Sequence, residues 1–305
     1  MEVEVDRLTK SYDGRTYALC EVSLRLGPGI AGLVGPNGAG KTTLMRSLAT
    51  LLRPTAGTAR FDGHDILSDP MFARHHLGYL PQDFGLYPQL TAEQFLDFLA
   101  RLDGVRERAA RREHVARALA TVHLTADARK RLGAYSGGMR QRIGIAQALM
   151  RDPAVLILDE PTAGLDPAER QDFHSLLALL GARMTILLSS HILSDIANIC
   201  SQVFVIAQGR LKASGTPDDL IAALQGQVFE CLVNDGQMSE VAQRGQILFS
   251  RREAAGIIVR LYTVDPSTLP ADAHPVPPSL DDAYLIFTGA NLEQTSAFNQ
   301  AVRSA

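Results

Sequence analysis

Cysteine is scarce in this sequence, and no apolar run is long enough to cross a membrane. The 305 residues include three cysteines, Cys20, Cys200 and Cys231, which lie far apart and form no CxxC pair. This pattern argues against a disulfide framework or a zinc site and fits a reducing cytosol. The best apolar candidate, residues 176–188, is interrupted by a glycine and an arginine, whereas a transmembrane helix needs about 20 apolar residues. We therefore expect another polypeptide to supply any membrane-embedded part.

A strong charge of one sign is also lacking. The net charge of -3 gives no general attraction to nucleic acid or to anionic lipid. The first ten residues, MEVEVDRLTK, are acidic and contain no apolar run, so we expect no signal peptide. Apolar residues make up 46% of the chain and charged residues 21%, a balance typical of a soluble globular protein. The length is sufficient for one sizeable α/β domain and a smaller one.

Short strands alternate with helical segments up to about residue 224. Buried strands and a closing hairpin are expected at residues 30–34, 155–158, 185–188, 203–206 and 210–213. Apolar residues at helical spacing occupy much of residues 91–150. Strands that alternate with helices in this way indicate a parallel sheet covered on both faces. The sequence therefore predicts an α/β domain over residues 1–224, with a helical subdomain at about residues 91–150.

The pattern changes after about residue 224. Strands are expected at residues 228–233, 247–250 and 257–264, and a proline-rich stretch at residues 270–278 precedes a short helix at residues 281–286. The sequence predicts a small α+β accessory domain over residues 225–290, followed by a tail at residues 291–305. It contains no recognisable catalytic cluster, so regulation, dimer support and docking to a membrane partner are all open, and dimer support or regulation is the expected role.

A glycine-rich segment follows the buried strand at residues 30–34 and precedes apolar residues at helical spacing. It reads GPNGAGKTT and consists of Gly35, Pro36, Asn37, Gly38, Ala39, Gly40, Lys41, Thr42 and Thr43. The segment matches the P-loop pattern, in which backbone N–H groups and a helix N-terminus surround phosphate oxygens. Lys41 is expected to reach the β- and γ-phosphates, and Thr42 to hold Mg²⁺. The alternative, a turn that binds nothing, is disfavoured by the complete pattern in this context.

Two adjacent carboxylates, Asp159 and Glu160, end the expected strand at residues 155–158. Because side chains alternate along a strand, the two point in different directions and can take different roles. Asp159 suits Mg²⁺ coordination through water, and Glu160 suits a base or positioning group for the attacking water. An acidic pair at a strand end is common by itself, so this assignment depends on the P-loop.

A third motif, Ser136-Gly137-Gly138, lies between the P-loop and the acidic pair and opens a helical run. Ser136 is a good N-cap, and the two glycines allow close approach of the backbone to a ligand. Such a triplet alone is usually only a helix cap. Its place between the other two motifs indicates a second anion site.

In their order along the chain, these motifs resemble the ATP-binding cassette (ABC) family. The resemblance is carried by GPNGAGKTT, by YLPQDF with its Gln82, by YSGGMRQR, by VLILDEPTAGLD and by SSH, and it covers about residues 1–224. It implies a mixed-sheet core with an antiparallel β subdomain and a helical subdomain, and it implies ATP and Mg²⁺ as ligands. In this family two cassettes face each other, and each ATP lies between one P-loop and the partner's Ser-Gly-Gly motif.

The resemblance also implies which residues contact ATP outside the P-loop. Tyr12 would stack on adenine, although an aromatic side chain near a strand end is often only packed. Ser136 and Gly138, with Gly137 between them, would clasp the γ-phosphate of the opposite ATP. Asp166, at the end of the segment AGLD, would communicate across the dimer.

A catalytic set and a metal set follow from the same resemblance. Gln82 would contact Mg²⁺ and relay to the membrane partner, and His191 would sense the γ-phosphate, although a lone histidine after a strand is more often structural. The implied catalytic residues are Lys41, Gln82, Glu160 and His191. The implied metal-binding residues are Thr42, Gln82 and Asp159.

Two positions depart from the common LSGGQ form of the third motif. Tyr135 stands where leucine is usual, and Met139 stands where glutamine is usual. Since Ser136, Gly137 and Gly138 remain, we expect ATP hydrolysis to be retained. The departure puts the contacts of position 139 across the dimer in doubt.

The surrounding sequence resembles a bacterial subfamily in which ATPase and permease are separate chains, often exporters. The resemblance lies in GPNGAGKTTLMR, LYPQLTAEQ, DEPTAGLDP and the C-terminal SLDDAYLIFTG. The expected partners are a second copy of the same or a similar cassette and a separate integral membrane permease, with the chain cytoplasmic and peripheral on the inner face of the cell membrane. Residues 84–98 are expected to meet the permease, with an ordinary packed loop and helix as the alternative.

Cassette ATPases that perform no transport form the alternative class of function, since some act on ribosomes, DNA or soluble assembly partners. Translation factors of this kind carry two cassettes in one chain, and DNA-repair members contain long coiled coils, neither of which is found in this chain. An importer motor is a second rival, because the ATPase motifs do not distinguish import from export. Basic residues outnumber acidic ones at residues 101–131, but a solvated helix face explains such a segment best, so no nucleic-acid partner is expected.

Overall fold

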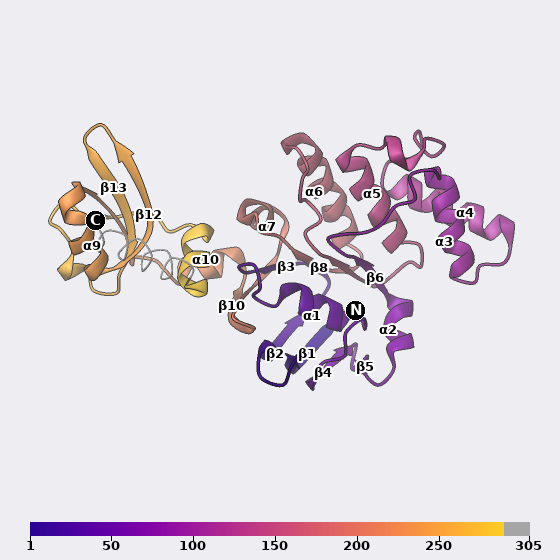
Figure 1. The fold of residues 1–305 in the computed structure, drawn as a ribbon, viewed down its shortest axis with the longest axis horizontal. Helices are drawn as coiled ribbons and strands as arrows, with labels where there is room; N and C mark the ends of the chain where they lie inside the picture. Colours follow the sequence, from indigo (N-terminus) through magenta and orange to yellow (C-terminus); the bar gives the residue numbers. More distant parts are fainter. Residues whose placement is uncertain (290–305) are drawn as a thin grey trace.

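The computed structural model describes residues 1–289, so the expected tail at residues 291–305 lies outside the described residues. A six-stranded sheet with the strand order β10-β9-β3-β8-β7-β6 forms its centre (Figure 1). The strands are β3 (Gly29–Val34), β6 (Leu77–Leu80), β7 (Val155–Leu158), β8 (Thr185–Ser189), β9 (Gln202–Ala207) and β10 (Arg210–Gly215). All neighbours are parallel except β9 and β10, which form the expected antiparallel hairpin. The predicted α/β class with a mixed sheet is confirmed.

A second, antiparallel sheet lies beside the first, below it in the view of Figure 1. Its strand order is β2-β1-β4-β5, with the strands β1 (Val3–Ser11), β2 (Tyr17–Leu26), β4 (Ala56–Phe61) and β5 (His64–Asp65). Along β1, Val3 and Val5 are buried while the exposed Asp6 and Arg7 follow them. The buried Val3 and Val5, two residues apart on one side of the strand, therefore mark the face on which this sheet packs.

Helices cover both faces of the central sheet. They are α1 (Lys41–Leu48), α2 (Pro70–His76), α6 (Pro167–Gly181), α7 (Leu193–Ile199) and α8 (Pro217–Ala222). The helical part between β6 and β7 contains α3 (Ala92–Leu102), α4 (Arg108–Thr121), a short 3₁₀ turn (Leu132–Ala134) and α5 (Gly137–Ala148). Among residues 1–289, no helix is both long enough and apolar enough to cross a membrane.

Local signals explain where two of these helices begin. At α3 the Thr91 side chain accepts from the Gln94 N–H, while the Gln94 side chain accepts from the Thr91 N–H, which satisfies two free donors of the first turn. At α6 the N-cap is Asp166, and Pro167 occupies the first turn, where its missing N–H costs nothing. Helix α1 ends at Leu48, and two residues later Thr50 adopts a left-handed backbone with φ 56° that cannot continue it.

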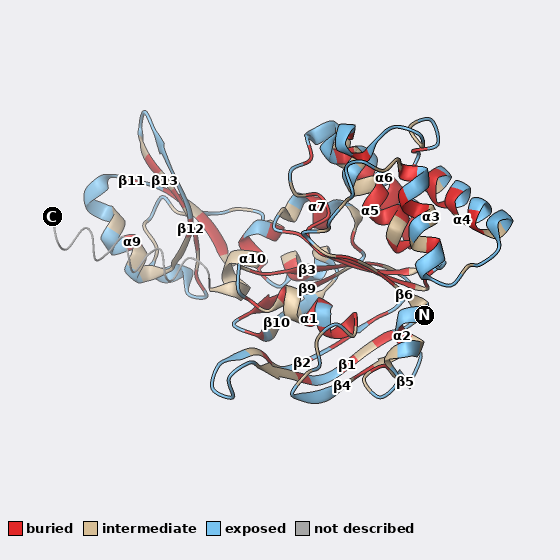
Figure 2. Ribbon diagram, turned by 45° about the vertical axis from the view of Figure 1, so that its right-hand side comes forward, coloured by how far each residue is buried: buried red, intermediate tan, exposed pale blue. Residues whose placement is uncertain are grey.

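The buried strands divide their side chains between two hydrophobic cores. Leu156 and Leu158 of β7 face one core, whereas Val155 and Ile157 face the other. The first core includes α5 and α6, and the second includes α1 and the antiparallel sheet. Figure 2 shows the resulting band of buried residues along the central strands. Strands buried on both faces cannot be displaced easily, so their ends are firm supports for a site.

The C-terminal region forms a four-stranded sheet of its own, with the order β12-β13-β11-β14. Its elements are β11 (Val228–Val233), α9 (Met238–Arg244), β12 (Gln246–Glu253), β13 (Gly256–Tyr262), β14 (His274–Pro275) and two 3₁₀ turns (Asp235–Gln237 and Pro266–Thr268). A small core of its own includes Phe229, Cys231, Val241 and Val259. The three strands expected from the sequence are thus present, with β13 ending at Tyr262 rather than at Val264.

The last described helix, α10 (Leu280–Thr288), packs against the ATP-binding part of the chain rather than only against the C-terminal sheet. Its Leu280 and Ala283 belong to the same hydrophobic core as Leu220 and Leu224. Figure 1 shows α10 between the C-terminal sheet and the region of β10 and α7. The boundary near residue 224 stays a prediction, and the core itself continues across it.

One arginine joins α10 to the C-terminal sheet. From β13, the Arg260 guanidinium donates to both carboxylate oxygens of Asp282 at 2.7–3.2 Å and to Glu230 Oε1 on β11 at 2.9 Å. Asp282 is 4% exposed. The Ser279 hydroxyl and N–H also donate to it. Hydrogen bonding to the Asp282 carboxylate, together with Glu230, raises the pKa of Arg260 above its usual value.

Replacing Asp282 by alanine is expected to lower the free energy of unfolding by about 3 kcal/mol, because Arg260 then loses its bidentate partner at a buried position. Chemical denaturation followed by circular dichroism measures this change. The matched control is Asp281→Ala on the exposed side of the same helical turn, for which a loss below about 1 kcal/mol is expected. An equal loss of unfolding free energy in the two variants would show that the ion pair between Arg260 and Asp282 does not stabilise the fold.

Candidate nucleotide site

The segment at residues 35–43 wraps around the start of α1, directly after β3. Gly40 is the N-cap of α1 and has φ 106°, and a Cβ atom there would lie 2.4 Å from the carbonyl oxygen of Ala18. Only glycine fits this position, since both the backbone angle and the contact exclude a side chain. The N-terminus of α1 and its free N–H groups therefore face the loop, which is the arrangement that binds phosphate.

Lys41 connects the loop to the acidic pair. Its ammonium group donates to the carbonyl oxygens of Gly35 and Pro36 at 2.6 and 3.2 Å. Burial lowers the pKa of Lys41 from its ordinary value, and Glu160 and Asp159 oppose that shift. The ammonium group and the two carboxylates thus form one charged cluster at the ends of β3 and β7.

Asp159 has one carboxylate oxygen free for a ligand. The Ser189 hydroxyl donates to Asp159 Oδ1 at 2.7 Å, whereas the buried Oδ2 has no hydrogen-bond partner among residues 1–289. Asp159 is 2% exposed, and leaving such an oxygen unpaired is costly. A hard cation such as Mg²⁺ would satisfy it, because Mg²⁺ is bound through carboxylates, waters and phosphates. The residues present thus fit the metal that the sequence predicts.

Glu160 lies just beyond the end of β7, and its carboxylate has a different partner from that of Asp159. Its backbone adopts φ 53°, and its N–H donates to the Ser189 hydroxyl at 2.9 Å. The Glu160 carboxylate is paired with His191, with 2.5 Å between Oε2 and Nδ1. His191 stays 59% exposed on its side chain, so it can meet a ligand while it orients Glu160.

A cavity of about 560 Å³ collects most of the predicted residues. It is lined by Ala18, Asn37, Gly38, Ala39, Gly40, Lys41, Thr42, Thr43, Gln82, Asp159, Glu160 and His191. These residues come from the loop before α1, the ends of β6 and β7, and the segment after β8. Residues distant in the sequence therefore converge at the carboxyl edge of the sheet, where open α/β sheets bind ligands.

Gln82 lines this cavity, whereas Tyr12 lies beside the loop and is not among the lining residues. The Tyr12 hydroxyl is 3.4 Å from Thr43 Oγ1, and the residue is 66% exposed, so its ring is accessible beside the loop. Gln82 lines the nucleotide cavity and also a second groove, of about 570 Å³, that includes Phe84 and Arg140. Gln82 thus lines both the nucleotide cavity and the second groove.

The Ser-Gly-Gly motif lies outside the nucleotide cavity of its own chain, because none of its residues lines that cavity. Ser136 is the N-cap of α5 and accepts from the Met139 N–H at 3.2 Å, as expected. Tyr135 is buried, and its hydroxyl donates to the Asp127 carbonyl oxygen at 2.9 Å. Burial raises the pKa of Tyr135 to about 12, with Asp127 adding to the effect. The aromatic replacement therefore anchors the loop before α5.

Sequence reasoning missed two residues at these sites. Ser189 bridges Asp159 and the backbone of Glu160, and its position at the end of a strand, in the motif SSH, was the available signal. Glu169 on α6 accepts hydrogen bonds from the Ser136 hydroxyl and the Gly138 N–H, at 3.1 and 3.2 Å. No sequence pattern marks Glu169, which lies 33 residues from Ser136.

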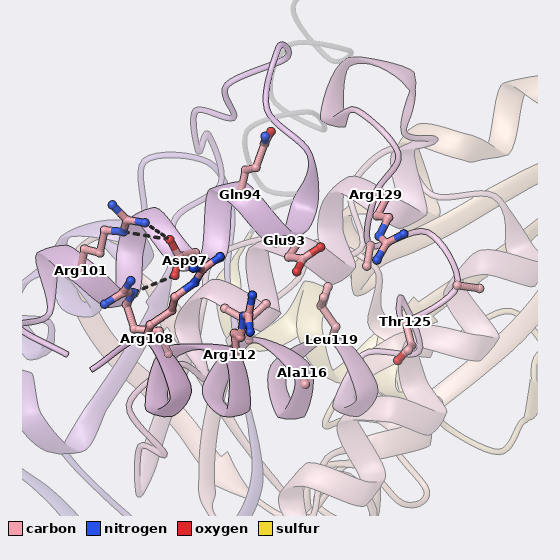
Figure 3. Close-up of a pocket in the computed structure, with 14 residues that line it drawn as sticks. Glu93, Gln94, Asp97, Arg101, Arg108, Arg112, Ala116, Leu119, Thr125 and Arg129 are labelled. Carbon is pink, nitrogen blue, oxygen red and sulfur yellow. Dashed lines mark hydrogen bonds and ion pairs between the residues drawn. The ribbon is translucent and has the colours of Figure 1, made fainter. Parts of the chain in front are cut away.

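A larger cavity lies elsewhere, between α3 and α4 (Figure 3). Its volume is about 780 Å³, and Arg108, Arg112 and Arg129 are among its lining residues. Asp97 pairs with Arg101 and Arg111 at 2.8 and 2.7 Å. No residue of the nucleotide motifs lines this cavity, so the arginine-rich segment is separate from the nucleotide site.

A loop of this kind between a central parallel strand and a helix, with an acidic pair on a nearby strand, defines a P-loop nucleoside triphosphatase. The family described as "ABC transporter" matches residues 19–163. The Nod factor export ATP-binding protein I of Paraburkholderia xenovorans is 36% identical over 304 residues, which cover 95% of this chain and 98% of that protein. The chain belongs to the ABC transporter ATP-binding proteins.

Two further similarities support this assignment. The daunorubicin/doxorubicin resistance ATP-binding protein DrrA of Streptomyces peucetius is 39% identical over 245 residues, covering 79% of this chain and 73% of that protein. The dimeric structure of a post-hydrolysis state of the ATP-binding cassette MJ0796, bound to ADP and Pi, is 25% identical with a TM-score of 0.63 and covers 70% of this chain and 98% of that one. This chain is therefore the ATPase subunit of an ABC transporter, in which ATP hydrolysis is coupled to transport. Family membership decides against the cassette ATPases that perform no transport.

Replacing Ser189 by alanine is expected to reduce ATP turnover about ten-fold or more, because the Asp159 carboxylate and the Glu160 backbone N–H both lose the hydroxyl that orients them. The steady-state rate of phosphate release measures the effect. Ser190→Ala is the matched control, since the Ser190 hydroxyl bonds only within its own turn, to Ile192. If both variants hydrolysed ATP at the parent rate, the bridging role of Ser189 would be wrong.

Proposed function

We propose that two such cassettes close around two ATP molecules and thereby drive a separate membrane permease in export. The observation that carries this proposal is the separation of the two halves of the site within one chain. Residues 37–43 of the loop and Glu160 line one cavity, while Ser136 lies outside it. A second cassette is needed to bring a Ser-Gly-Gly motif to the phosphates, and the dimeric structure of the similar cassette described above supports such a pairing of two cassettes.

Within each closed site, the chain's own residues would hold and orient the reactants. The loop amides and Lys41 bind the phosphates, and Tyr12 stacks on adenine. Glu160 positions the attacking water and accepts its proton, while His191 keeps the carboxylate oriented. Thr42, Asp159 and Gln82 would hold Mg²⁺, which would neutralise charge on the β- and γ-phosphates when bound. Ser136 and Gly138 of the partner would complete the cage, and Asp166 would lie at the contact between the cassettes.

Export is the direction we favour. The printed names of two similar proteins refer to Nod factor export and to daunorubicin/doxorubicin resistance, and the first of these similarities extends over the C-terminal region of this chain. The chain would then work at the inner face of the cell membrane, where the permease presents its cytoplasmic loops. The permease would determine the transported substrate.

The groove beside Gln82 is the surface that we assign to the permease. It is lined in part by Phe84, Gly85, Leu86 and Pro88. Nearby, Tyr87 and Phe98 are 49% and 40% exposed, with their rings in an edge contact at 6.1 Å. Exposed aromatic side chains beside a groove are typical of a protein interface. Since Gln82 also lines the nucleotide cavity, a movement there would reach the permease directly.

Glu160→Gln is expected to retain ATP binding and to reduce turnover at least about one hundred-fold, because an amide cannot accept the proton of the attacking water. Equilibrium binding of radiolabelled ATP and phosphate release are measured on the same preparation. Lys41→Ala is the comparison variant and should lose binding as well, because the ammonium group that attracts phosphate is removed. Hydrolysis by Glu160→Gln at the parent rate would contradict the assignment of Glu160.

Gentle solubilisation of membranes from cells that carry the tagged chain should yield a stoichiometric polytopic membrane protein beside it. The result is expected because the groove and its exposed aromatic side chains need a partner in the membrane. Quantitative mass spectrometry of the purified complex is the measurement. Recovery of ribosomes or DNA in place of a membrane protein, or strong stimulation of the ATPase by RNA, would contradict the transport proposal.

A further inference from the structure

The two donors that the proposed function assigns to the partner's ATP are already paired within the chain. Ser136 Oγ donates to Glu169 Oε1 at 3.1 Å, and the Gly138 N–H donates to the same oxygen at 3.2 Å. One carboxylate oxygen thus occupies the point on which the hydroxyl and the amide converge. A phosphate oxygen would need that same point, since carboxylates and phosphates accept hydrogen bonds from the same kinds of donor.

The contact between Glu169 and α5 is built tightly. A Cβ atom on Gly138 would lie 2.7 Å from Glu169 Cδ, so this glycine is required for the carboxylate to approach. Glu169 is held on α6 by its own helix start, because its N–H donates to the N-cap Asp166 at 2.8 Å. Ser136 is exposed and Glu169 half-buried, so a second cassette can reach the pair.

A carboxylate and a phosphate cannot both occupy this point, because two negative groups at contact distance repel each other. Either the Glu169 side chain turns away when ATP arrives, or ATP does not engage Ser136. Turning away costs two charge-assisted hydrogen bonds, which the phosphate then replaces. The number of hydrogen bonds that Ser136 and Gly138 donate is then unchanged. Closure of the dimer, however, requires that the Glu169 side chain is displaced first.

We infer that Glu169 is an internal competitor for the phosphate position of the Ser-Gly-Gly motif, and that it raises the ATP concentration needed for two cassettes to close. This inference rests on the proposed function, in which Ser136 and Gly138 contact the ATP of the opposite cassette. Glu169 does not line the chain's own nucleotide cavity. ATP binding to the single chain is therefore independent of it, and only closure of the dimer depends on it.

The test uses Glu160→Gln protein, in which bound ATP is not consumed, and compares it with the Glu160→Gln, Glu169→Gln double variant. Glutamine keeps the size and the acceptor oxygen but removes the charge that opposes the phosphate. The dimer fraction is followed by sedimentation velocity over a series of Mg-ATP concentrations. The midpoint for dimerisation is expected to fall about ten-fold in the double variant, while the affinity of the monomer for ATP stays unchanged.

Asp172→Asn in the same background is the matched control. It removes one negative charge from α6, and Asp172 pairs with Arg142 rather than with Ser136. Its midpoint should match that of the Glu160→Gln parent. Thermal unfolding followed by circular dichroism verifies that both helices remain folded, and Glu169→Ala provides a second variant without the acceptor oxygen, which should also dimerise at lower ATP.

The outcomes separate the inference from the proposed function. An unchanged or higher midpoint in both Glu169 variants, with dimers still forming on ATP, overturns the inference and leaves the proposed function standing. Monomers that bind ATP but never associate at saturating ATP, with or without Glu169, overturn the proposed function and the inference with it. A lower midpoint for the Glu169 variants, with the Asp172 control unchanged, supports both.

Discussion

Parallel pairing of β3 with β8 and of β8 with β7 is the constraint on which the nucleotide site depends. Because these strands run in one direction, the loop before α1, the acidic pair and the segment after β8 all emerge at the same edge. Both faces of the strands are buried, which fixes their register against slippage. The Ser189 hydroxyl can therefore bridge Asp159 and Glu160 across neighbouring strands, and the site keeps its geometry before any ligand arrives.

The helical part of the chain follows a different principle, since its anion site faces outward and needs a second molecule. Ser136 begins α5 at the surface, and Glu169 on the adjacent α6 meets it there. The donors on α5 are thereby satisfied in the single chain rather than left open to water. These donors have hydrogen-bond partners both in the single chain and in the proposed closed dimer. Because closing and opening only exchange one partner for another, the number of hydrogen bonds changes little, which suits a repeated cycle.

Much of the site could be predicted because its motifs are local. The loop at residues 35–43 and the pair Asp159 and Glu160 each depend on a few neighbouring residues, and the confirmed α/β fold orders them correctly. The contacts of Ser189 and Glu169 could not be predicted, since they join residues about 30 positions apart through the packing of strands and helices. The apolar pattern of α10 predicted a helix but did not indicate which face of the protein it covers.

The position of α10 has a consequence for how the chain acquires its structure. Ala283 is fully buried, and it completes a core to which Leu220 and Leu224 contribute from far earlier in the chain. A ribosome releases these earlier residues first, so their apolar surface stays uncovered until residues 280–288 have emerged. The docking of α10 is then a late step of folding during synthesis, and the ATP-binding part completes this core only when α10 has been made.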